Sequence, residues 1–206
     1  MKETKSRLVN SIKYTGFFGI IVVLFIYLQM LFRIYYADVC FENAVRSIDR
    51  GEYDIAVVYV NQAIKSNSEE PNYLRLKAKA LILISTDATG DESYEYKTVA
   101  LDSLRKAYEL NPNNLVTIRN SVPLYYYLSV HDYSLPPSVD NLDDRFIRYA
   151  ADFFETVKER YSHDVGVITL IAKYENRLGL YEEYNDSVSL VEKLRPDLLD
   201  WHTNFN

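Results

Sequence analysis

The sequence predicts an all-α protein, in which a single transmembrane helix is followed by an α-solenoid of about four helix-turn-helix repeats. Three observations support this. Residues 14–32 are nineteen consecutive residues without a charge. The rest of the chain holds few Gly and Pro and long segments in which apolar residues recur at helical spacing. Pairs of small residues, seven positions apart, recur along those segments and are followed by turn-forming residues.

The chain begins with a basic tail, residues 1–13, and residues 14–36 form the predicted transmembrane helix. Nineteen residues at about 1.5 Å each span about 28 Å, close to the roughly 30 Å of a bilayer's hydrocarbon core. Tyr14 at one end, and Tyr35 and Tyr36 at the other, suit the membrane interfaces. A cleaved signal peptide needs a small-residue cleavage site, but Arg33-Ile34-Tyr35-Tyr36 follows the apolar run. The segment therefore reads as an anchor.

Basic residues flanking the anchor predict its orientation. Four precede it and three follow it within about 20 residues: Lys2, Lys5, Arg7 and Lys13, then Arg33, Arg46 and Arg50. This bias favours a cytoplasmic N-terminus. The remaining chain would then lie on the extracytoplasmic side of the membrane.

The repeat pattern is clearest in the segment Gly51–Pro71. Ala56 and Ala63 lie two turns apart on one helical face, where small side chains let a second helix approach closely. Gly51 is placed to end the preceding helix, because glycine readily adopts the left-handed conformation of a tight reversal. Pro71 suits the first turn of the next helix.

In these residues the chain resembles the tetratricopeptide repeat (TPR) family, whose unit is about 34 residues long. The resemblance extends over residues 37–196. Later copies place Ala100 and Ala107 before Pro112, Ala150 and Val157 before a polar turn, and Gly179, Tyr184 and Val191 before Pro196. Two positions depart from the family pattern: Tyr184 is large where Ala is usual, and Pro123 falls inside a predicted first helix.

The spacing predicts helices at about 38–50, 53–67, 72–85, 94–110, 114–129, 144–161, 165–178 and 181–194. The anchor can continue without a break into the first of them. Two of the repeats carry extra residues, which we expect to form loops at Thr86–Ser93 and Val130–Asp143. Residues 197–206 are a C-terminal tail, whose Trp201 is placed to cap the open end of the last repeat.

Charge and motif content exclude several classes of function. The net charge is −6 overall and +4 within residues 1–36, so residues 37–206 carry −10, which disfavours nucleic-acid binding. His131, His163 and His202 have no partner at metal-ligand spacing, and there is no Gly-rich phosphate loop or nucleophile elbow. Cys40 stands alone and is interpreted as a small packing residue. We therefore expect no catalytic site, metal, cofactor or small-molecule substrate.

The first helix of each TPR pair lines the family's concave groove, and the resemblance assigns partner-binding residues on that basis. They are Arg75, Lys79, Arg119, Tyr126, Lys173 and Arg177. Such a groove suits an extended or acidic peptide, since Arg grips carboxylates and Tyr packs against apolar groups. The basic residues are similar to the carboxylate clamps of chaperone-adaptor TPR proteins. Lys79 stands where those clamps have Asn, so the ligand of those clamps is not assigned to this chain. The other interpretation is a solvated face whose charges are balanced between helices.

The sequence thus predicts a membrane-anchored TPR adaptor that binds a protein or peptide, as an accessory to a membrane or envelope-assembly complex. Two alternatives stay open. One is a structural subunit packed permanently into a larger membrane complex through its convex face. The other is an organelle import receptor with the repeats facing the cytosol.

Overall fold

The computed structural model describes the backbone of residues 2–196 and the side chains of residues 16–196. Within this range the chain is all-helical, as predicted, with eight α-helices, one short 3-10 helix and no strand. The elements in order are α1 (Lys2–Asp49), α2 (Tyr53–Ser66), α3 (Pro71–Asp87), α4 (Asp91–Leu110), α5 (Leu115–Leu128), η1 (Val139–Asn141), α6 (Asp144–Arg160), α7 (Val165–Arg177) and α8 (Tyr181–Leu194). The predicted cap, residues 197–206 with Trp201, lies outside the described residues.

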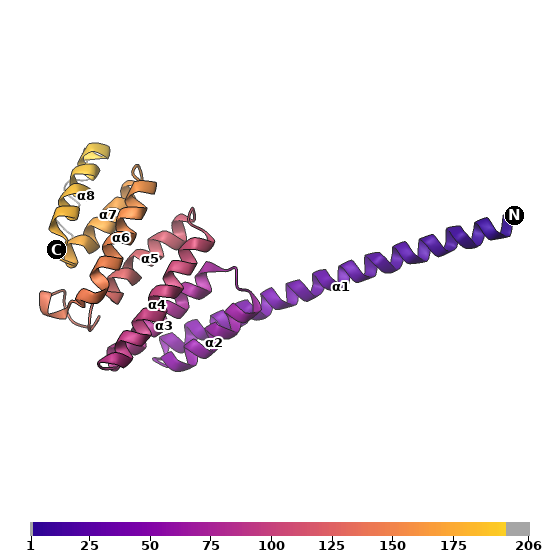
Figure 1. Ribbon diagram of the computed structural model, residues 1–206, viewed down its shortest axis with the longest axis horizontal. Helices are drawn as coiled ribbons and strands as arrows, with labels where there is room; N and C mark the ends of the chain where they lie inside the picture. Colours follow the sequence, from indigo (N-terminus) through magenta and orange to yellow (C-terminus); the bar gives the residue numbers. More distant parts are fainter. Residues whose placement is uncertain (1, 197–206) are drawn as a thin grey trace.

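Helix α1 runs unbroken through the predicted anchor and into the helical domain, and it projects far beyond the other helices (Figure 1). Its part from Gly16 to Asp49 contains an 18-residue stretch with a mean hydropathy of 2.3, and it is long and apolar enough to cross a membrane. Side chains from Gly16 to Tyr36 are exposed, and burial begins at Ala37, which is 0% exposed. The apolar segment therefore has no covering from the rest of the described chain.

Three helix reversals in the described part of the chain contain a glycine at positive φ, and two of them share one hydrogen-bond pattern. Gly51 has a φ of +76° between α1 and α2, and Gly179 has a φ of +73° between α7 and α8. At the first turn the backbone N–H of Glu52 donates to the Ser47 carbonyl at 2.8 Å, and at the second the N–H of Leu180 donates to the Glu175 carbonyl at 3.0 Å. These are the six-to-one bonds of a Schellman motif, which needs a left-handed residue. The sequence predicted both turns.

The helices after the anchor form a row in which each contacts the next along the chain (Figure 1). Contacts also join α1 to α3, α3 to α5 and α5 to α7, so these alternate helices form one side of the row. The recurring small residues lie at the contacts between helices, and all are 0% exposed: Ala56, Ala63, Ala100, Ala107, Ala150 and Val157. Tyr184 is half-buried, and α8 is buried at Ser187 and Val191 instead.

The extra residues are accommodated in two different ways. The expected loop at Thr86–Ser93 was wrong: α3 continues to Asp87, α4 begins at Asp91, and only a short turn separates them. The added length lies in these two helices, which have 17 and 20 residues. By contrast, Val130–Asp143 is a true connection, closed by a bridge between Val130 and Leu142 and containing η1.

Candidate partner-binding surface

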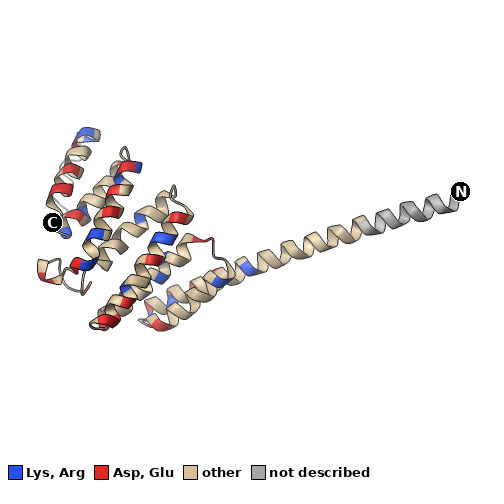
Figure 2. Cartoon of the chain, in the orientation of Figure 1, with Lys and Arg blue, Asp and Glu red and all other residues tan. Residues whose placement is uncertain are grey.

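The predicted binding residues belong to α3, α5 and α7, which follow one another on the same side of the row. We call this side the α3–α5–α7 face. The three helices hold six basic residues and two acidic ones, whereas α2, α4, α6 and α8 together hold fourteen acidic residues and nine basic ones. Figure 2 shows the charges along each helix. The helices with a basic excess alternate along the sequence with the others, and the fold places them together on one side of the row.

A continuous set of side chains crosses the α3–α5–α7 face. Lys79 of α3 and Tyr127 of α5 line a pocket of about 210 Å³ together with Ile82, Leu83, Leu124 and Tyr133. The ring of Tyr127 lies 5.3 Å from that of Tyr126, which lies 5.1 Å from that of Tyr174 on α7. The Arg177 guanidinium lies over the rings of Tyr126 and Tyr174, 5.9 Å and 5.7 Å from their respective centres. Cation–π contacts of this kind orient the guanidinium without neutralising it.

Burial distinguishes the members of this set. Tyr126 is 4% exposed and Tyr174 is 6% exposed, and their burial raises the pKa of each phenol. Most of the Tyr126 ring is therefore covered by neighbouring side chains, whereas Tyr127 beside it is half-buried and lines the pocket. Lys79 is exposed at the rim of the pocket. Lys173 is half-buried, with its ammonium 5.9 Å from the Tyr174 ring.

Two predicted arginines have partners within the chain. Arg119 forms an ion pair with Asp164 at 3.0 Å and 3.3 Å, and a Cβ at Gly166 would lie 2.8 Å from its Nη2. This pair joins α5 to the first turn of α7. Arg75 is half-buried, donates to the Asn72 side chain and leaves its Nε without a partner. Burial lowers the pKa of its guanidinium. Arg119 therefore ties α5 to the start of α7, whereas the contact of Arg75 lies within α3. Lys79, Lys173 and Arg177 are the cations that lie beside the pocket and the aromatic row.

Tyr133 was not predicted, and it reaches the pocket from the connection between α5 and α6. Its pKa is raised to about 12, first by burial and then by a hydrogen bond with Tyr53 at the start of α2. The three consecutive tyrosines at 125–127 were a sequence signal for the pocket. No comparable signal marked Tyr133, because its position depends on how the connection folds.

A buried ion pair holds that connection in place. The Lys97 ammonium donates to Asp143 at 2.9 Å and to the Val130 carbonyl at 2.8 Å, and the two side chains are 1% and 2% exposed. Arg145 adds two bonds to the same carboxylate, at 2.8 Å and 2.9 Å. Burial alone would raise the pKa of Asp143, but the hydrogen bonds from Arg145 and Lys97 outweigh it and lower the pKa to about 2. Both ends of the connection are therefore fixed to α4.

The chain was also compared with known proteins. No protein-family model matches it, and no curated protein is significantly similar to it. The partner-binding assignment therefore depends on the geometry described above.

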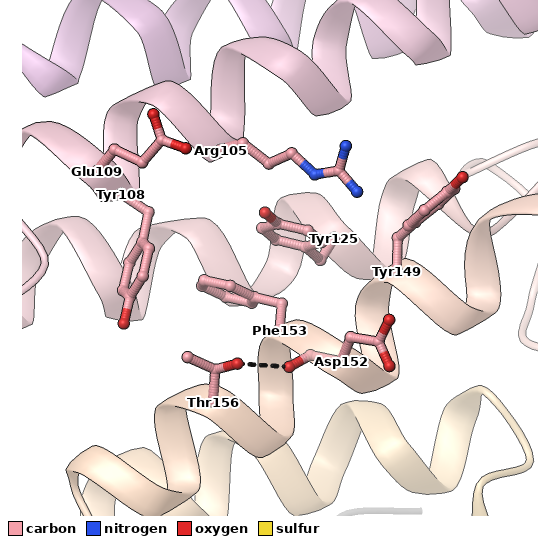
Figure 3. Close-up of a pocket in the computed structure, with 8 residues that line it drawn as sticks. All are labelled: Arg105, Tyr108, Glu109, Tyr125, Tyr149, Asp152, Phe153 and Thr156. Atoms are coloured by element: carbon pink, nitrogen blue, oxygen red, sulfur yellow. Dashed lines mark hydrogen bonds between the residues drawn. The ribbon is translucent and has the colours of Figure 1, made fainter.

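A second pocket, of about 260 Å³, lies among α4, α5 and α6 (Figure 3). Tyr125 and Phe153 stack at 4.0 Å, Tyr108 meets Phe153 edge-on at 5.7 Å, and the Arg105 guanidinium lies 4.9 Å from the Tyr149 ring. The hydroxyl of Tyr108 is buried without a hydrogen-bond partner. Glu109 and Asp152 bring negative charge to the rim. This pocket offers aromatic contact with mixed charge and lacks the basic excess of the α3–α5–α7 face.

Among the described residues, no group of three His, Cys, Asp or Glu side chains is arranged to hold a metal ion. Cys40 is buried, and its thiol donates to Gln62 at 3.7 Å. The Asp143 carboxylate, whose pKa is lowered to about 2, forms ion pairs with Lys97 and Arg145.

Proposed function

We propose that this protein is a single-pass, membrane-anchored adaptor that binds an acidic, extended segment of a partner protein on its α3–α5–α7 face. In this proposal α1 crosses the bilayer, and α1 to α8 form a TPR-like solenoid of four helix pairs. The protein performs no catalysis and acts as an accessory to a membrane or envelope-assembly complex. Its N-terminus is cytoplasmic and its helical domain extracytoplasmic.

The anchor is supported by the exposure of α1. Its apolar side chains from Phe17 to Tyr36 are 40% to 70% exposed, an arrangement that costs free energy in water and is favourable in lipid. The solenoid is supported by the contacts between successive and alternate helices, and by the fully buried small residues at the repeat positions.

The separation of charge carries the binding proposal. The three helices of the α3–α5–α7 face have a basic excess in a domain that is acidic overall. A partner segment with carboxylates would be attracted to this face and repelled by α4 and α8. The pocket beside Lys79 is apolar and aromatic, so it suits one apolar side chain of the same segment.

In-cell photo-crosslinking tests the proposal. A benzoylphenylalanine at position 127 replaces a half-buried tyrosine at the pocket and keeps a similar shape. We expect capture of one discrete protein through a peptide rich in Asp and Glu. Lys79→Glu should reduce that capture by about fivefold or more, because it exchanges an attraction for a repulsion.

The matched control is Lys106→Glu, which makes the same charge change at an exposed position of α4. It should leave capture unchanged. Arg119 is a poor site for charge reversal, because a Glu there would face Asp164 and disturb α7. Capture from position 127 that is insensitive to Lys79→Glu contradicts the adaptor proposal.

The pocket among α4, α5 and α6 favours a second candidate, a structural subunit that docks through the opposite side of the row. A buried hydroxyl without a partner and a stacked aromatic pair are suited to a permanent contact. A crosslinker at Tyr149, which is 38% exposed, distinguishes the two functions. Stoichiometric capture from position 149 together with no capture from position 127 would support the structural subunit.

A further inference from the structure

The second helix returns to the membrane end of the domain. Helix α2 packs along α1 from Ala37 onward, and its last turn, with Lys65 and Ser66, reaches the point where the apolar segment ends. There, Arg33 and Tyr36 of α1 and Gln62, Lys65 and Ser66 of α2 line a pocket of about 470 Å³. The site is thus built from two helices that meet at the end of the proposed membrane span.

The pocket is cationic and rich in hydrogen-bond donors. Neither Arg33 nor Lys65 forms a salt bridge with any described side chain. The Tyr36 hydroxyl donates to Gln62 at 3.5 Å, a long contact that a better acceptor can replace. The carbonyls at the end of α2 carry partial negative charge, and Lys65 in that last turn offsets it.

The nearby carboxylates have other partners. Asp38, two residues beyond Tyr36, accepts a hydrogen bond from the Tyr73 hydroxyl of α3. Glu70 accepts bonds from the backbone and side chain of Asn72 at the start of α3, and Glu69 accepts one from Ser68 at 3.3 Å. Because no described carboxylate forms an ion pair with Arg33 or Lys65, the two cations can bind an external anion.

Depth in the membrane identifies the anion. Arg33 is the first charge after an uncharged stretch of nineteen residues, a length that crosses about 30 Å of hydrocarbon. A side chain at that position reaches the layer of lipid phosphates. We propose that this pocket binds the phosphate of an anionic phospholipid headgroup and so fixes the domain's orientation against the bilayer. The inference rests on the proposed membrane anchor.

Native mass spectrometry of the delipidated full-length protein, released from detergent micelles, tests the site. The protein is titrated with phosphatidylglycerol and, separately, with phosphatidylcholine. We expect one phosphatidylglycerol to bind in preference to phosphatidylcholine. Arg33→Gln and Lys65→Gln should each weaken that binding by about fivefold, whereas Lys106→Gln on α4 should not change it.

Three results would overturn the proposal. The first is equal retention of the two lipids. The second is a phosphatidylglycerol preference that survives both substitutions together. The third is displacement of the lipid by millimolar inorganic phosphate, which would identify a site for soluble anions. Both substituted side chains are outside the core, and near-ultraviolet circular dichroism checks that the variants remain folded.

Alkaline extraction of membranes from cells expressing the same variants separates failure of this proposal from failure of the anchor. Recovery of the wild-type protein in the soluble fraction would refute the anchor and the headgroup site together. A protein that stays in the membrane but shows no lipid preference would refute the headgroup site alone.

Discussion

Replacing Asp143 with Asn is expected to destabilise the helical domain by about 3 kcal/mol. The substitution removes the negative charge between Lys97 and Arg145 and leaves a nearly isosteric side chain. The Lys97 ammonium would stay in a site where it is 1% exposed, with only neutral acceptors beside it, namely the Val130 carbonyl and the amide oxygen of the new side chain.

The magnitude follows from the burial of each partner. Breaking a buried ion pair by changing one member costs about 3–5 kcal/mol, since the other charge is left without compensation. Arg145 is 48% exposed and can turn toward water, so Lys97 carries most of the penalty and the lower end applies. The lowering of the Asp143 pKa from 3.8 to about 2 corresponds to about 2.5 kcal/mol. Burial lowers the pKa of Lys97, and this cost of burying the ammonium reduces the net stabilisation that the ion pair provides.

Urea unfolding of the full-length protein in detergent micelles measures this effect, with near-ultraviolet circular dichroism of the buried tyrosines as the signal. The control is Asp140→Asn, an exposed carboxylate in the same connection, which should change stability by less than about 0.5 kcal/mol. Equal denaturant slopes in variant and wild type would show that the same surface is exposed on unfolding.

The pH dependence gives a second measurement. The folded-state pKa of Asp143 lies below its unfolded value, so its stabilisation is present above about pH 4 and is lost as the pH falls toward 2. As the pH falls through that window, the wild type should lose about 2.5 kcal/mol of stability that the Asp143→Asn variant does not lose. A variant within about 1 kcal/mol of wild type at pH 7, or one with an unchanged acid transition, would refute the structural role of the pair.

Three further predictions concern the helix contacts and turns, each measured by urea unfolding. Gly179→Ala should cost about 1 kcal/mol from backbone strain alone, because φ is +73° and an added Cβ meets no atom within 4 Å; an unchanged midpoint would contradict this. Ala63→Leu should cost about 1–3 kcal/mol by overpacking the α1–α2 contact, whereas Val58→Leu at a 56% exposed position should be nearly neutral. Burial raises the pKa of Glu175, so the stability it gives is lost as pH rises through that pKa. The stability of Glu175→Gln relative to wild type should therefore be higher at pH 7 than at pH 4. A higher relative stability at pH 4 would disprove this.

The amino-acid sequence determined the helices and their turns because those depend on residues close together in the chain. The expected helix at 53–67 is Tyr53–Ser66 in the structure, and that at 114–129 is Leu115–Leu128. Small residues seven apart mark the buried side of each helix, and the glycines at 51 and 179 mark reversals that other residues cannot make without strain. Uncharged length alone identified the segment able to cross a membrane.

Tertiary structure decided which side chains are available to a partner. Lys97 meets Asp143 across 46 positions and Arg119 meets Asp164 across 45, and neither pairing has a local sequence signal. Tyr126 and Tyr127 are adjacent in the sequence, yet one is buried against Tyr174 and the other lines the pocket. Helical periodicity fixes the direction of a side chain relative to its own helix. Whether a charge is exposed, or paired with a residue of a distant helix, depends on how the helices pack.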